Sequence, residues 1–262
     1  MFENTLIRRI LKNSGYLFSA TGISAALSML QGVFTARMLG VAGFGLFGTI
    51  SMFTSVVNKF ASFRMGELVV KYVGRYSEAG DTRRAAAVFK AAALAETLAS
   101  LIAFAFILLL APLGARYFAR DPGLSGWFSL YGLIILANLI SESSTGLLQI
   151  FDRFRRMAYL TVVQSGVTLA LIALAYFAST GLIKLPSGLH ETLLSPSSTH
   201  PGLLPVILAY VAGKVIGALG LTAAAVQEAG RRWGAGSTLE PRSNAKKKRL
   251  CPLPIPPPTP LP

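Results

Sequence analysis

Cysteine and histidine are almost absent from this 262-residue sequence. Its single cysteine, Cys251, excludes an intramolecular disulfide and a cysteine-cluster metal site. The two histidines, His190 and His200, lie in a segment rich in proline and serine, and their spacing matches no metal-ligand pattern. Neither histidine is paired with a nucleophile, and there is no Gly-rich phosphate loop. We therefore expect no enzymatic activity, no metal site and no cofactor.

Charged residues are also scarce, at 14% of the chain, whereas 53% of the residues are hydrophobic. This composition is too apolar for an ordinary soluble domain. The 25 basic residues outnumber the 11 acidic ones, which by itself would suggest nucleic acid. However, the basic residues lie at the ends of apolar segments and in a C-terminal tail. We therefore predict an integral membrane protein that does not bind nucleic acid.

Six apolar segments are long enough to cross a bilayer, because about 20 residues of helix span the hydrocarbon core. They are Ser14–Ala36, Phe44–Phe63, Val88–Leu110, Gly126–Ile150, Thr161–Ile183 and Leu203–Val226. The first two are separated only by a short Gly-rich turn around Met38 to Gly43, which predicts antiparallel neighbours. The predicted fold class is all-α, a polytopic membrane protein with six transmembrane helices.

The segment from Glu67 to Arg84 has a different pattern. Its apolar residues recur at helical spacing opposite charged ones, which predicts a helix that extends from the membrane or lies on its surface. Gly80 should end this helix, and Asp81 or Thr82 should cap the next one.

The loops between the six segments alternate between many and few basic residues. Eighteen Lys and Arg residues precede the first segment or follow the second, fourth and sixth, whereas the other loops hold only Arg37, Arg116, Arg120 and Lys184. Basic loops favour the cytoplasmic side. The sequence therefore predicts a multi-pass protein of the cell membrane with both termini in the cytoplasm.

The chain changes character towards its C-terminus. Seven of the 14 prolines lie in Pro252 to Pro262, directly after the basic run Lys246 to Arg249. Such a composition cannot bury a core. We therefore divide the chain into a transmembrane lobe, residues 1–233, and a disordered basic and proline-rich tail, residues 234–262, which contacts anionic lipid or has no role.

Several junctions between these segments resemble a known family. The residues are Asn13-Ser14, Ala36-Arg37-Met38-Leu39-Gly40, Gly43-Phe44-Gly45, Phe63-Arg64-Met65-Gly66 and Phe151-Asp152-Arg153-Phe154-Arg155-Arg156. In this order the chain, from about Leu6 to Trp233, resembles the amino-terminal half of the O-antigen and oligosaccharide flippases. These polysaccharide exporters belong to the multidrug/oligosaccharidyl-lipid/polysaccharide superfamily.

The resemblance implies a carrier whose two helical lobes face a central cavity. It implies movement of undecaprenyl-pyrophosphate-linked glycans, such as those of O-antigen and lipopolysaccharide synthesis, to the outer leaflet. Members of that family usually have 12 to 14 spans, whereas six are predicted here. We therefore expect this chain to supply one lobe, as a half-length or truncated carrier, and a second lobe or a homodimer to complete it.

Polar side chains within the predicted spans are candidate functional residues, because ionisable groups at bilayer depth are costly and need a partner or water. The candidates for substrate binding are Lys59, Lys214, Asn58 and Gln31, since lysines that line a cavity would offset phosphate charge. Glu96 and Glu142 are the candidates for ion pairing or ion coupling. Alternatively, the lysines pair with these glutamates and hold the bundle together, or extend to the membrane surface.

Two other functions remain open from the residues. One is a drug or metabolite antiporter of the same superfamily, which would need a membrane carboxylate for proton or sodium coupling. The other is a membrane scaffold or relic that transports nothing, in which case loss of the protein would have no effect on glycan export.

Overall fold

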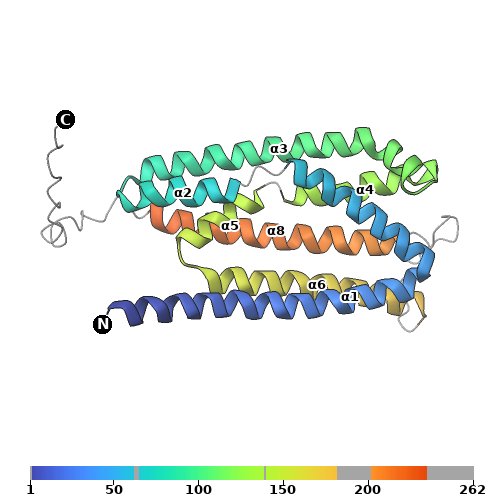
Figure 1. Ribbon diagram of the computed structural model, residues 1–262, viewed down its shortest axis with the longest axis horizontal. Coiled ribbons are helices and arrows are strands. Elements are labelled where there is room, and N and C mark those ends of the chain that lie inside the picture. The colour runs from blue at the N-terminus through green and yellow to red at the C-terminus, as the bar shows by residue number, and fades with distance from the viewer. Residues whose placement is uncertain (1, 62–64, 139, 182–201, 235–262) are drawn as a thin grey trace, which may run out of the picture.

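The computed structural model describes residues 2–61, 65–138, 140–181 and 202–234, and the described part of the chain is all-α, as predicted. Most of the α-helices run along the long axis of the molecule, whereas the second part of α1 crosses the bundle obliquely (Figure 1). They are α1 (Phe2–Ala61), α2 (Met65–Glu78), α3 (Thr82–Tyr117), α4 (Ser125–Ala137), α5 (Ser141–Ile150), α6 (Phe154–Ser179) and α8 (Leu203–Gly234), with a short 3-10 turn, η1 (Pro122–Leu124), before α4.

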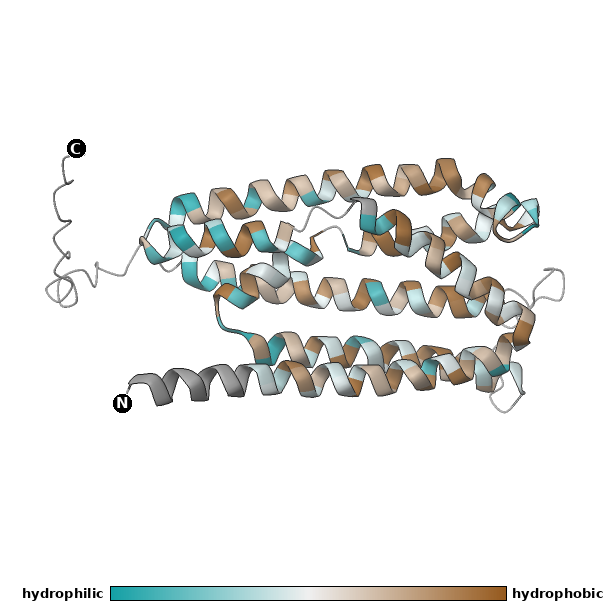
Figure 2. Ribbon diagram, viewed as in Figure 1, coloured by the Kyte–Doolittle hydropathy of each residue, from teal (hydrophilic) through white to brown (hydrophobic). Residues whose placement is uncertain are grey.

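Five helical stretches are long and apolar enough to cross a membrane, which makes the chain a multi-pass membrane protein by length and composition. They are Ser14–Lys59, Thr82–Tyr117, Pro122–Ile150, Phe154–Ser179 and Leu203–Trp233. Apolar residues predominate along the middle of these helices, and hydrophilic residues gather towards the ends (Figure 2).

The first two predicted spans lie within one stretch, Ser14–Lys59, but the helical backbone is interrupted at Gly40, so they are two helices that meet at a kink inside the predicted Gly-rich turn. The stretch Ser14–Lys59 has 46 residues, about 69 Å of helix, which is more than twice the hydrocarbon thickness. Gly40 adopts φ 67° and ψ −178° inside α1. Glycine accepts this backbone conformation because it has no Cβ. Beyond the resulting kink, the helix turns back towards the middle of the molecule (Figure 1).

The fourth predicted span, Gly126–Ile150, is not one helix. α4 ends at Ala137, where Asn138 is the C-cap, and α5 begins at Ser141 after the N-cap Ile140. A helix break at bilayer depth frees backbone N–H and C=O groups, which then need partners inside the protein. In this chain the partner for the N–H groups of α5 comes from α3, as described below.

The predicted amphipathic segment after the second span is confirmed. It forms α2, and Gly80 follows it with φ 79°. Asp81 caps α3, since its Oδ1 accepts a hydrogen bond from the backbone N–H of Arg84 at 3.0 Å. The apolar side of α2 is buried at Val69 and Val73.

Two large apolar clusters occupy opposite ends of the bundle. One contains Phe47, Ile50 and Phe128 and joins α1, α3, α4 and α8. The other contains Val69, Phe89 and Leu147 and joins α2, α3, α5 and α8. On α3, the residue of the first cluster nearest the middle of the helix is Ala111, and the buried residue of the second cluster nearest the middle is Phe89. Polar residues between these two levels therefore lie at the middle of the bundle.

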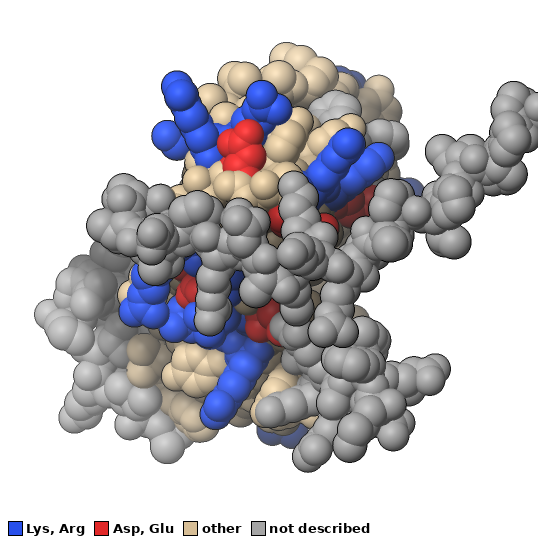
Figure 3. Space-filling model, turned by 90° about the vertical axis from the view of Figure 1, so that its left-hand side faces the viewer, with Lys and Arg blue, Asp and Glu red and all other residues tan. Residues whose placement is uncertain are grey.

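The N-terminus, the α2–α3 and α5–α6 connections and the end of α8 all lie at one end of the molecule (Figure 1). We call it the basic end. Lys and Arg side chains gather there around a few acidic ones (Figure 3). Its basic residues include Arg75, Arg83, Arg84, Arg153, Arg155, Arg156, Arg231 and Arg232.

Two predicted segments lie outside the described residues. One is the outer loop that contains His190 and His200, and the other is the basic and proline-rich tail that begins after Gly234.

Candidate functional site

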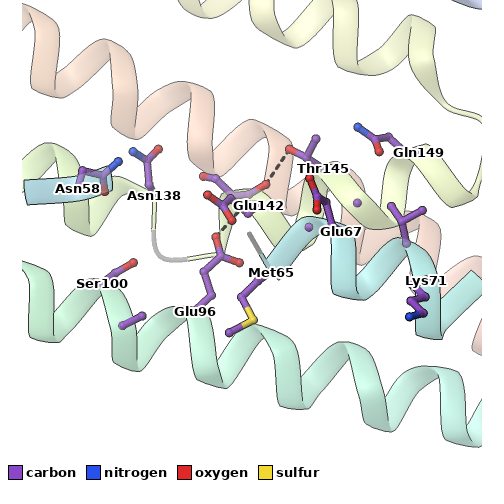
Figure 4. Close-up of a pocket in the computed structure, with 15 residues that line it drawn as sticks. Asn58, Met65, Glu67, Lys71, Glu96, Ser100, Asn138, Glu142, Thr145 and Gln149 are labelled. Carbon is purple, nitrogen blue, oxygen red and sulfur yellow. Dashed lines mark hydrogen bonds between the residues drawn. The ribbon is translucent and has the colours of Figure 1, made fainter. Parts of the chain in front are cut away.

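A polar cavity of about 630 Å³ opens between the end of α1, the start of α2, the middle of α3 and the start of α5 (Figure 4). Most of its polar lining comes from carboxylates, amides and hydroxyls, together with one ammonium group. These residues are Asn58, Glu67, Lys71, Glu96, Ser100, Asn138, Ser141, Glu142, Thr145 and Gln149. The cavity therefore gathers polar groups from the spanning helices and from α2, beside the apolar cluster that contains Val69 and Leu147.

Glu96 organises this cavity. Its side chain is only 6% exposed, and its Oε1 and Oε2 accept hydrogen bonds from the backbone N–H groups of Glu142 and Ser143 at 2.7 and 2.9 Å. The carboxylate therefore caps the N-terminus of α5 from the neighbouring helix α3. A negative charge is favourable at this helix end, where free N–H groups and the helix dipole are both positive.

Two glycines bring α2 and α5 into direct contact beside the cavity. A Cβ added at Gly146 would lie 2.6 Å from the carbonyl oxygen of Gly66, and one added at Gly66 would lie 3.0 Å from the carbonyl oxygen of Glu142. Any side chain at Gly146 would separate the two backbones. These glycines thus hold the start of α2, which carries Glu67, against the start of α5, which carries Glu142.

The chemistry of the lining suits a ligand with many hydroxyl groups, or a cation. Asn58, Asn138 and Gln149 can each donate and accept hydrogen bonds through their amides. Glu67, Glu96 and Glu142 supply acceptors and negative charge, and Lys71 supplies a positive charge further out (Figure 4). Among the described residues, no three His, Cys, Asp or Glu side chains form a group that could hold a metal ion.

The structure brings together three of the six predicted site residues. Asn58, Glu96 and Glu142 all line the cavity. Lys59 and Lys214 are both exposed, near the end of α1 and on α8, and neither lines this cavity.

Gln31 lies elsewhere in the bundle. Its side chain is 5% exposed, and its Nε2 donates to the carbonyl oxygen of Ser165 at 2.9 Å. This hydrogen bond joins α1 to α6. The alternative prediction, in which a lysine pairs with Glu96, does not fit the structure. The Glu96 carboxylate accepts hydrogen bonds from two backbone N–H groups instead.

Sequence reasoning missed a second charged cluster, centred on Glu228 at the basic end. Glu228 is 2% exposed, and Arg153, Arg156 and Arg232 lie 2.7, 3.3 and 3.5 Å from its carboxylate oxygens. The i, i+4 spacing of Glu228 and Arg232 was the available signal. The other two arginines come from the start of α6 and its N-cap, which the sequence does not place beside α8.

A polar cavity inside a multi-pass helical bundle, beside a broken helix, is the architecture that transport proteins use to hold polar cargo within a membrane. The family comparison agrees with this class. A model of the polysaccharide biosynthesis protein family, a family of flippases, matches residues 10–248, so the chain belongs to that family. No curated protein and no solved structure matches the chain. The family match extends past residue 233, where we expected the transmembrane lobe to end.

Proposed function

We propose that this protein moves lipid-linked oligosaccharide or polysaccharide precursors across the cytoplasmic membrane. The observation that carries the proposal is the polar cavity inside a helical bundle that belongs to the polysaccharide biosynthesis family. A volume of about 630 Å³ falls within the range of small-molecule sites, about 300 to 1,000 Å³, and would hold a few sugar units.

In this proposal the amides and carboxylates of the cavity bind sugar hydroxyls while the polyprenyl chain stays in lipid. Asn58 and Asn138 face the cavity from α1 and from the α4–α5 break (Figure 4). Each hydrogen bond to the cargo replaces one with water, so the sugars can enter the bundle without a large desolvation cost.

The pyrophosphate of the cargo needs positive charge, and Lys59 and Lys214 are our candidates. Both are exposed at the surface of this bundle rather than in its cavity. A lysine in that position either extends to the membrane surface or faces water shared with another lobe. We propose the second arrangement, in which another chain or a second copy completes the cargo pathway.

A specific observation also favours a second function, ion-coupled antiport of a drug or metabolite. Three carboxylates line one cavity, and one of them, Glu96, is buried against a helix N-terminus. Proton or sodium binding at Glu142 or Glu67 would change the net charge of this cavity, which is the property that a coupled carrier needs.

We propose that the basic end faces the cytoplasm, so that both termini are cytoplasmic. Support comes from the gathering of Lys and Arg at that end, together with the preference of basic loops for the cytoplasmic side (Figure 3).

Deletion of the gene from its host tests the proposed function against its rivals. The flippase proposal expects lipid-linked glycan to be synthesised but not exported, with export restored by the wild-type gene and not by an Asn58→Leu, Asn138→Leu double variant. Increased sensitivity to toxic compounds with normal glycan export would favour the antiporter. Normal growth, export and resistance would favour a scaffold or relic.

A further inference from the structure

A second cavity, of about 440 Å³, lies between the start of α6 and the end of α8 at the basic end. Its lining is Arg155, Arg156, Tyr159, Leu160, Ala224 and Gln227. None of these residues lines the polar cavity described above. The site is therefore separate from the proposed cargo site.

The two arginines of this second cavity are held differently. The Nη1 of Arg156 lies 3.3 Å from the Oε2 of Glu228, which fixes the guanidinium but leaves most of its five N–H donors free. Arg155 is exposed, and it has no acidic partner among the residues that the structure describes. The cavity thus presents one oriented guanidinium and one without a counter-charge.

Glu228 does not neutralise this region. Its single carboxylate is already shared by Arg153, Arg156 and Arg232. Arg231, one helical turn beyond Gln227, adds another exposed positive charge. The surroundings of the second cavity therefore keep an excess of positive charge, which favours an anionic ligand.

The side of this cavity nearer the middle of the bundle is apolar. Tyr159 is 69% exposed and lies one helical turn beyond Arg155, towards the centre of the molecule. Leu160 packs closely at Gly220, where an added Cβ would lie 3.2 Å from the leucine Cδ2. Tyrosine is common at the boundary between headgroups and hydrocarbon, because its ring is apolar and its hydroxyl is polar.

We propose that the second cavity binds the phosphate of an anionic phospholipid in the leaflet at the basic end. Arg155 and Arg156 donate to the phosphate oxygens, and Tyr159 and Leu160 contact the glycerol and the first methylenes of the acyl chains. Basic pockets between membrane helices at the headgroup level bind acidic lipids in this way. The proposal rests on the membrane placement of the chain, and it does not depend on glycan transport.

Native mass spectrometry of the full chain with added lipid tests this proposal. Phosphatidylglycerol should form stable adducts, and phosphatidylcholine should not. Each arginine near an anionic membrane surface contributes about fivefold to the affinity for acidic lipid. Arg155→Gln should therefore weaken phosphatidylglycerol binding about fivefold, and the Arg155→Gln, Arg156→Gln double variant should weaken it about 25-fold. Arg155→Lys should keep most of the binding, because it keeps the charge.

The matched control is the Arg83→Gln, Lys90→Gln double variant, which removes two exposed charges from α3 near the same end. It should bind phosphatidylglycerol like the wild type. Because Arg156 also pairs with Glu228, Gln227→Glu supplies a variant that leaves this ion pair intact and adds a repelling charge to the cavity. Its phosphatidylglycerol binding should fall at least fivefold.

Four results would overturn the proposal. Two are equal binding of the two phospholipids and equal losses in the control and cavity variants. The third is displacement of phosphatidylglycerol by undecaprenyl phosphate at an equal concentration, which would assign the cavity to the cargo lipid. The fourth is competition by inorganic phosphate alone at the same concentration, which would assign the cavity to a free anion. Failure of glycan transport would leave the phospholipid result unchanged, so the two proposals fail separately.

Discussion

At the scale of single residues, Glu96 has a structural role that its position in the sequence does not reveal. An isolated glutamate in an apolar segment suggests an ion pair or a coupling site. Its carboxylate instead accepts two backbone N–H groups from a helix that begins about 45 residues later. Periodicity and charge spacing within α3 contain no information about that partner, because the contact exists only once α5 packs against α3.

The first prediction concerns the stability that Glu96 provides. Glu96→Ala should lower the free energy of unfolding by about 2 to 4 kcal/mol, because two backbone N–H groups lose their buried acceptor. Glu96→Gln should cost about half as much, since the amide keeps one acceptor oxygen. Equilibrium unfolding with sodium dodecyl sulfate in mixed micelles measures the difference.

Gln149→Ala is the control for Glu96, since Gln149 lines the same cavity and is exposed. Its unfolding free energy should stay within about 0.5 kcal/mol of the wild type. A Glu96→Ala variant as stable as this control would show that the cap does not stabilise α5.

The second prediction concerns the two lysines at the surface of the bundle. If Lys59 and Lys214 contact the pyrophosphate, replacing either with Ala should reduce glycan export about tenfold while expression stays unchanged, since a charge-assisted hydrogen bond is lost. Lys90→Ala, an exposed lysine near the basic end, is the matched control and should export normally. Unchanged export in the Lys59→Ala and Lys214→Ala variants would contradict the prediction and would favour lysines that only extend to the membrane surface.

At the scale of helices, the sequence predicted the apolar segments and the interruption between the first two, but not the break within the fourth. The end of α2, the turn at Gly80 and the Asp81 cap of α3 were predictable because capping is local. The interruption at Gly40 was also predictable, because it lies within the Gly-rich turn expected between the first two spans. The α4–α5 break was hidden inside an apolar run, because its compensation comes from the distant residue Glu96.

The same limit applies to the candidate site. Asn58, Glu96 and Glu142 could be selected because polar residues stand out in apolar segments, and all three line the cavity. Asn138 and Gln149 were not selected, although both belong to the lining. Their place in the lining depends on how α1, α2, α3 and α5 pack around the break, and the sequence does not show that packing.

The third prediction concerns the contact between α2 and α5. Gly146→Ala should destabilise the protein by about 1 to 3 kcal/mol, because its Cβ would lie 2.6 Å from the carbonyl oxygen of Gly66 and the two backbones would have to separate. Gly166→Ala, on α6 with open space around the added Cβ, should be neutral or stabilise by up to about 1 kcal/mol. The same micelle unfolding assay compares the two, and equal stabilities would contradict the close approach.

At the scale of the whole molecule, the fourth prediction is the orientation in the membrane. Single cysteines introduced as Ala79→Cys and Gly126→Cys, in a Cys251→Ser background, would stand at opposite ends of the bundle (Figure 1). With the basic end in the cytoplasm, an impermeant maleimide should label Gly126→Cys in intact cells and Ala79→Cys only after permeabilisation. The reverse pattern would contradict the orientation, and labelling of both from one side would contradict the arrangement of the helices.

The central claim is that a polar cavity inside this bundle lets a lipid-linked glycan cross the membrane. Flipping of a fluorescent undecaprenyl-pyrophosphate-linked sugar in proteoliposomes measures this most directly, with the fluorescence on the outer surface bleached chemically over time. The account predicts transfer well above that of protein-free vesicles, reduced at least tenfold by the Asn58→Leu, Asn138→Leu double variant and unaffected by the Arg83→Gln, Lys90→Gln control. Transfer at the rate of protein-free vesicles by correctly folded protein, or equal transfer by the cavity variant, would contradict it.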